Sequence, residues 1–124
     1  MRPAYDDSNI FARILRGEIP NDTVAESDHA LAFRDISPKA PTHVLVIPKG
    51  AYVSLDDFAA HASPEEITDF MRLVARVADS EGVGLTAGGQ GFRAIANAGD
   101  DGVQEVPHFH LHILGGRNIG RMIE

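Results

Sequence analysis

One segment near the C-terminus places three histidines at alternate positions of the chain. Residues 108–113 read His-Phe-His-Leu-His-Ile. Because successive side chains of a strand point to opposite faces, this alternation predicts a strand with three imidazoles on one face and three apolar groups on the other. Histidines on a partly buried face are costly unless they are hydrogen-bonded, so this face is a candidate functional site.

Two kinds of chemistry use imidazoles in this arrangement. Neutral imidazole is a ligand for zinc, copper, nickel and iron, and histidines two apart on a strand can bind one ion. Alternatively, an imidazole with a pKa of about 6.5 is mostly neutral at pH 7 and can attack a phosphorus centre while its neighbours hold phosphoryl oxygens. A surface strand or an artificial tag is disfavoured by the alternating apolar residues. The spacing alone leaves metal binding and phosphorus chemistry open.

Composition removes several other classes of site. The chain of 124 residues has no cysteine, which excludes disulfide scaffolds, thiolate zinc sites, iron–sulfur clusters and a cysteine nucleophile. The net charge of −7 argues against a protein that coats nucleic acid or anionic lipid, because such binding needs a basic face. No stretch resembles a membrane span or a signal peptide. We therefore expect a single cytoplasmic domain over residues 1–124, with neither nucleic acid nor membrane as partner.

The remaining sequence predicts two helices among short strands. A short helix follows Asn9 and ends at Gly17, and a long helix runs from Ser63 to Glu81 behind a capping box. Strands are expected at 23–26, 30–34, 42–47, 92–97 and 109–114, and residues 85–91 form a glycine-rich connector. The order favours an α+β fold with a mainly antiparallel sheet of about five strands.

Several segments together resemble the Hint branch of the histidine triad (HIT) superfamily. Residues 108–114 match the family's His-φ-His-φ-His-φ-φ signature, where φ is apolar, and Gly-Gly-Arg follows at 115–117 as in the Hint branch. Residues 10–20, 32–38 and 40–49 also look like Hint motifs and stand in the family's order, so the resemblance covers about residues 8–117. It implies a HIT-like fold, a homodimer, no cofactor and no metal. The implied activity is hydrolysis of purine nucleoside 5′-phosphoramidates or acyl-adenylates through a nucleotidyl-histidine.

The resemblance assigns a role to each of four histidines. His110 matches the central histidine that attacks the α-phosphorus, and its other ring nitrogen should donate to the backbone carbonyl of His108. His112 matches the histidine that binds a non-bridging oxygen. His43 matches the upstream histidine, and we expect it to pack beside His108 and support it in a relay. His29 and His61 are expected to be incidental.

The resemblance also implies a nucleotide-binding set. The Asp35 carboxylate matches the acceptor of both ribose hydroxyls, a task that suits a carboxylate. The loop before the triad matches the segment that surrounds the phosphate, with Asn97, Gln104 and backbone N–H groups. The apolar base pocket comprises Ile10, Phe11, Ile14, Phe33, Ile36 and Leu45. On pattern alone, these apolar residues are equally suited to a hydrophobic core. Asp35 is equally suited to an ordinary turn, and the loop before the triad to a plain hairpin.

Some positions depart from the family's usual residues. Glu105, which joins the substrate-binding set, stands where eukaryotic Hint proteins have serine and bacterial members often have glutamate. Val103 replaces a common glycine, and Pro107 a common tyrosine. Asn9 and Ala12 occupy the positions of a Cys-x-x-Cys zinc clip found in some relatives, so structural zinc is not expected there. Two alternatives stay open: a nucleotide-binding regulatory module with residual catalysis, and a metalloprotein using His43, His108, His110 and His112.

Overall fold

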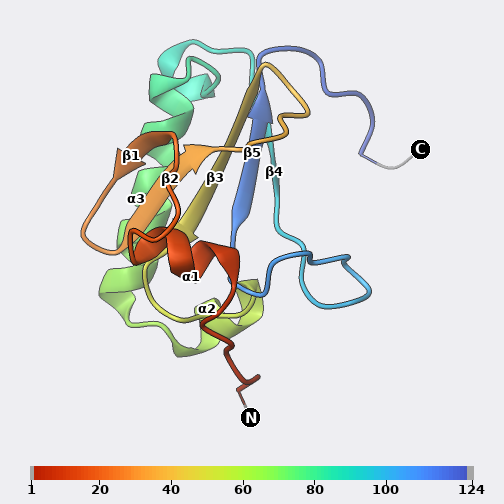
Figure 1. Ribbon diagram of the computed structural model, residues 1–124. Helices are drawn as coiled ribbons and strands as arrows, with labels where there is room; N and C mark the ends of the chain where they lie inside the picture. The colour runs from red at the N-terminus through yellow and green to blue at the C-terminus, as the bar shows by residue number, and fades with distance from the viewer. Residues whose placement is uncertain (1, 123–124) are drawn as a thin grey trace.

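The centre of the fold is an antiparallel five-stranded sheet, which the computed structural model describes within residues 2–122 (Figure 1). In chain order the strands are β1 (Thr23–Glu26), β2 (Ala30–Arg34), β3 (Thr42–Pro48), β4 (Phe92–Ile95) and β5 (Leu111–Gly115). Their order in the sheet is β1-β2-β3-β5-β4. The late strand β5 is thus inserted beside β3, and the expected α+β fold is confirmed.

Within residues 2–122, three α-helices accompany the sheet, where two were expected. They are α1 (Ile10–Leu15), α2 (Leu55–His61) and α3 (Pro64–Ser80), and a short 3₁₀ turn η1 (Leu85–Ala87) lies in the glycine-rich connector. The α2 helix was missed, although Ser54 caps it by accepting a hydrogen bond from the Asp57 N–H, a recognisable Ser-x-x-Asp start. No helix within residues 2–122 has both the length and the apolar composition to cross a membrane.

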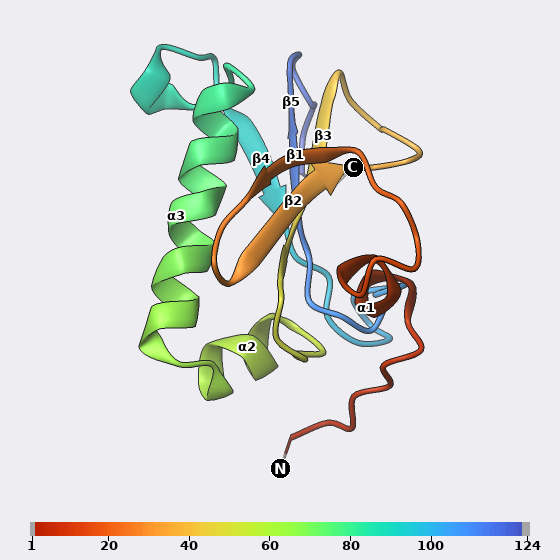
Figure 2. The same ribbon diagram turned by 60° about the vertical axis from the view of Figure 1, so that its left-hand side comes forward.

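The helices pack on opposite faces of the sheet. Figure 2 shows α3 along one face and α1 on the other. Along β3, Val44 and Val46 belong to the core under α3, whereas Leu45 and Ile47 belong to the cluster under α1. Because both faces of β3 are covered, every residue of this strand is buried.

The strand that carries the histidines begins later than predicted. β5 starts at Leu111 rather than at residue 109, and β4 ends at Ile95 rather than at residue 97. Before Leu111 the chain leaves the ladder, and the Phe109 N–H donates to the Tyr52 carbonyl oxygen at 2.8 Å. His108 and His110 therefore precede β5, and only His112 lies on it.

The register between β3 and β5 decides which histidines meet. Leu45 pairs with His112, and His43 pairs with Leu114. His43 and His112 are thus diagonal neighbours on one face of an antiparallel pair, within reach of long side chains. This face also carries Leu45, so the histidine cluster continues the α1 side of the sheet.

Candidate active site

Four histidines are gathered at the edge of the apolar cluster beneath α1. His43, His108 and His110 are buried, and His112 is partly exposed. The rings of His110 and His112 lie 5.1 Å apart between centroids, and the His110 ring meets the edge of Phe11 at 4.9 Å. The imidazole rings therefore lie directly against the apolar cluster that contains Phe11.

The ring of His110 is fixed by a backbone group. Its Nδ1 lies 2.8 Å from the carbonyl oxygen of His108. Because a carbonyl oxygen only accepts, Nδ1 carries the proton and donates, so Nε2 of the neutral ring keeps its lone pair. The expected hydrogen bond from His110 to the His108 carbonyl is confirmed.

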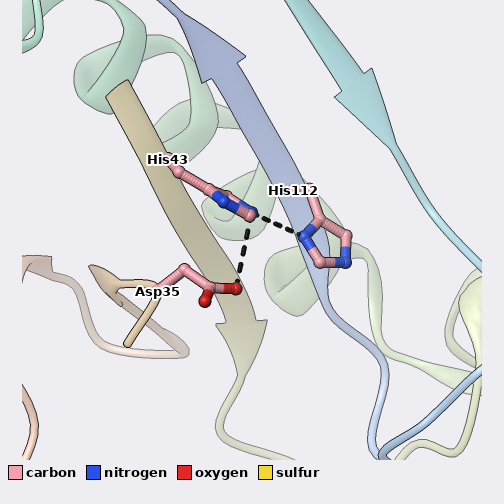
Figure 3. Close-up of side chains that lie close together, drawn as sticks. All are labelled: Asp35, His43 and His112. Carbon is pink, nitrogen blue, oxygen red and sulfur yellow. Dashed lines mark hydrogen bonds and ion pairs between the residues drawn. The ribbon is translucent and has the colours of Figure 1, made fainter. Parts of the chain in front are cut away.

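His43 contacts His112 and Asp35 rather than His108. The Lys39 N–H donates to His43 Nδ1 at 3.0 Å, so His43 Nε2 carries the proton of the neutral ring. That Nε2 lies 2.9 Å from His112 Nδ1 and 3.4 Å from Asp35 Oδ2 (Figure 3). The expectation that His43 packs beside His108 in a relay is wrong, because the strand register sets it diagonally opposite His112.

The same hydrogen bond fixes the tautomer of His112. Its Nδ1 accepts from His43, so its Nε2 carries the proton of the neutral ring. The Nε2 atoms of two rings in the cluster thus have opposite hydrogen-bonding roles. His110 has a free lone pair on Nε2, and His112 has a donating N–H on Nε2.

His108 is held from two sides and is fully buried. Its Nε2 lies 2.8 Å from the Pro48 carbonyl oxygen, and its Nδ1 lies 2.6 Å from the Tyr5 hydroxyl. Tyr5 was not predicted from the sequence, because it is 103 positions away along the chain and carries no motif. Both ring nitrogens of His108 are therefore engaged in structural hydrogen bonds.

Burial keeps the histidines neutral. It lowers the pKa of His43 and His110, and it lowers the pKa of His108 to about 4. The pKa of His112 also falls to about 4, through burial and then the neighbouring His110 and His43. At pH 7 the cluster consequently offers lone pairs and N–H dipoles rather than positive charge.

The residues predicted to bind the nucleoside fall into two groups. Phe11, Phe33 and Leu45 are buried in one cluster, against which Ile14 packs. Ile10 is 47% exposed and Ile36 is 98% exposed, and neither belongs to that cluster. Asp35 lies next to His43, with its Oδ1 accepting from the Ser37 N–H at 2.7 Å.

The loop before the triad is braced by one of its predicted phosphate ligands. The Gln104 amide nitrogen donates to the carbonyls of Val53 and Val106 at 2.6 and 3.0 Å, and its oxygen accepts from the Gly99 N–H at 3.0 Å. Both amide hydrogens are used within the protein, so Gln104 shapes the loop rather than offering a free donor. Asn97 is partly buried, and Glu105 is exposed.

The metal alternative takes a different form from the expected four histidines. Because both nitrogens of His108 are engaged, that ring has no free ligand atom. Within residues 2–122, ligand atoms of Asp35, His43 and His112 lie within 4.8 Å of one another. Two histidines and a carboxylate are a donor set that suits transition metals, and here the two facing histidine nitrogens already share a hydrogen bond.

The sheet, the inserted β5 and the histidine cluster agree with comparisons to known proteins. The sequence pattern of the HIT domain matches residues 16–119, and the chain belongs to this family. The chain is 54% identical to a 13.2 kDa HIT-like protein of Azospirillum brasilense, over 99% of this chain and 98% of that one. It is 40% identical to the purine nucleoside phosphoramidase of Escherichia coli, over 94% of each chain.

Solved structures show the same fold. A histidine triad protein of Clostridium difficile has a TM-score of 0.78 and 39% identity, with 95% of this chain and 98% of that chain covered. A HIT family hydrolase of Legionella pneumophila has a TM-score of 0.78 and 38% identity, with 90% of this chain and 95% of that chain covered. These likenesses support a hydrolase activity for this chain.

Proposed function

We propose that this protein hydrolyses purine nucleoside 5′-phosphoramidates, or the related acyl-adenylates, through a covalent intermediate on His110. The observation that carries the proposal is the lone pair on His110 Nε2, fixed by the 2.8 Å bond from Nδ1 to the His108 carbonyl. Its lowered pKa keeps this nitrogen unprotonated at neutral pH. The activity named for the E. coli relative supports the substrate class.

The reaction proceeds in two displacements at phosphorus. His110 Nε2 attacks the α-phosphorus, the phosphorus–nitrogen bond of the substrate breaks, and the amine departs after taking up a proton. Water then attacks the same phosphorus, the bond to His110 breaks, and the nucleoside monophosphate is released as the water gives up a proton. The His108 carbonyl stabilises the cationic imidazole of the intermediate, because Nδ1–H already points at it.

The neighbouring groups handle the charge of the phosphoryl group. His112 Nε2–H is positioned by His43 to donate to a non-bridging oxygen. The substrate carries about one negative charge there, which neutral donors can bind without a lysine or arginine. Asp35 accepts from the ribose hydroxyls, and the apolar residues under α1 contact the base.

Turnover of adenosine 5′-phosphoramidate by the purified protein tests this proposal. We expect AMP and ammonia as products. Rapid quenching in denaturant at alkaline pH, where a phosphorus–histidine bond survives, should trap a protein heavier by one adenylyl group that is absent from His110→Ala. Tight binding without turnover would instead favour the regulatory nucleotide-binding module.

The resemblance also predicts a homodimer. Sedimentation equilibrium of the purified protein checks this prediction.

A further inference from the structure

The segment that precedes α1 reaches the first histidine of the triad. The Tyr5 hydroxyl lies 2.6 Å from His108 Nδ1, and the two rings meet edge to face at 5.6 Å between centroids. The mechanism above makes no use of Tyr5. The contact nevertheless touches the residue whose backbone carbonyl orients His110.

The polarity of this contact follows from the other side of the ring. His108 Nε2 faces the Pro48 carbonyl oxygen at 2.8 Å, so Nε2 carries the proton. Nδ1 of the neutral ring is then an acceptor, and the Tyr5 O–H donates to it. His108 is completely buried, so without the hydroxyl this acceptor loses its partner away from solvent.

An ion pair anchors the segment that carries Tyr5. Arg2 Nε donates to Asp57 Oδ1 at 2.8 Å, and its guanidinium also donates to the Ala51 carbonyl at 2.9 Å and lies 5.3 Å from the centre of the Tyr52 ring. Asp57 is buried, and its pKa is lowered to about 2, chiefly by the bond to Arg2. On the other side of Tyr5, the Asn9 side chain caps α1. Tyr5 is therefore held between two fixed points.

We propose that Tyr5 is a positioning residue for His110 and acts through His108. Two hydrogen bonds hold the His108 ring, and the backbone carbonyl of the same residue holds the His110 ring. Loss of the Tyr5 hydroxyl frees His108 to change tautomer or to shift, and the carbonyl moves with it. This inference rests on the proposed function of His110.

Tyr5→Phe is the direct test, because it removes one oxygen and keeps the ring. We expect kcat for adenosine phosphoramidate to fall about tenfold with KM changed less than about twofold, because the His108 carbonyl that orients His110 shifts while the nucleoside contacts are kept. Tyr52→Phe is the matched control: it removes a hydroxyl that bonds Glu66, keeps the ring under Arg2, and should leave kcat unchanged. If Tyr5→Phe lowers the melting temperature but keeps the wild-type kcat, Tyr5 is merely structural and the inference is overturned.

A spectroscopic readout separates this inference from the proposed function. In wild-type protein, imidazole ¹⁵N shifts should report a proton on His108 Nε2 and on His110 Nδ1; in Tyr5→Phe we expect the His108 Nδ1 resonance to move. An inactive wild type with this shift change contradicts the proposed function but keeps the Tyr5–His108 link. An unchanged His108 spectrum contradicts the link.

A second variant guards against misfolding of Tyr5→Phe. Arg2→Gln leaves the Tyr5 hydroxyl in place and loosens the anchor of the segment, namely the bonds of Arg2 to Asp57 and Ala51 and its contact with the Tyr52 ring. We expect a loss of kcat in the same direction but smaller than for Tyr5→Phe, again with little change in KM. A wild-type kcat in Arg2→Gln, together with wild-type His108 shifts, contradicts the anchoring step.

Discussion

His43 Nε2 lies 2.9 Å from His112 Nδ1, which joins strands β3 and β5 on the face of the sheet that carries the triad. The bond forces the proton of the neutral His112 ring onto Nε2. His43 is itself fixed by the Lys39 N–H on its other nitrogen. A backbone amide thus sets, through two rings, which nitrogen of His112 carries the proton.

Replacing His43 should therefore impair turnover through His112. In His43→Leu the His112 Nδ1 loses its donor, and we expect kcat to fall about tenfold to a hundredfold, less than for loss of a direct oxyanion donor. His43→Gln, whose amide can donate to the same nitrogen, should retain more activity. Steady-state kinetics of the pair check this, and equal losses in both variants would count against a donor role.

Removing the proposed nucleophile, His110, should separate nucleotide binding from hydrolysis. His110→Ala is expected to reduce hydrolysis below detection while nucleotide affinity stays within about tenfold, because the proposed ribose and base contacts lie elsewhere. Calorimetric titration with AMP and product analysis measure the two effects. His29→Ala, in the exposed turn between β1 and β2, is the control. Residual turnover by His110→Ala above that of buffer would refute the covalent mechanism.

The stability of the fold should decline on mild acidification. The pKa of His108 and His112 is about 4 in the folded protein and about 6.5 in the unfolded chain, so between these values the unfolded state binds more protons. The contribution of these two histidines to the free energy of unfolding is fully present above pH 6.5 and is lost as the pH falls toward 4. Thermal unfolding from pH 7 to pH 4 measures this. A flat profile over this range would contradict it.

Val103 adopts a backbone conformation that suits glycine. Its φ is +55°, the left-handed region, which costs a β-branched residue about 1–2 kcal/mol. Val103→Gly should raise the free energy of unfolding by about 0.5–1 kcal/mol after the entropy of glycine in the unfolded chain is counted. The free energy of unfolding of Val103→Ala should lie between those of the wild type and Val103→Gly. Urea unfolding measures the series, and a less stable glycine variant would contradict the strain.

Chelation should leave the activity intact. Neutral imidazoles suffice for the proposed reaction, so prolonged EDTA treatment of untagged protein is expected to change kcat by less than about twofold. Elemental analysis should accompany the assay. Loss of activity that zinc restores would instead make Asp35, His43 and His112 a metal centre.

Much of the fold could be predicted from local chemistry. The Asn9 and Ser63 caps, the apolar stripe of the long helix and the β-branched run at 42–47 each determine their element within a few residues of sequence. The α2 helix was missed because its seven residues carry only a brief cap signal. The alternation of histidines and apolar residues at 108–113 is likewise a local pattern, and it is enough to indicate where the candidate site lies.

The sequence by itself determined which histidines are candidates for the chemistry, and the tertiary structure decided which side chains they touch. The hydrogen bond from His110 to the His108 carbonyl spans two residues, so local geometry sufficed to predict it. The contacts of His43 with His112 and of Tyr5 with His108 span 69 and 103 positions. They depend on strand register and on the docking of the N-terminal segment. A one-residue slip of register turns every side chain to the other face, and no local pattern in the sequence records that choice.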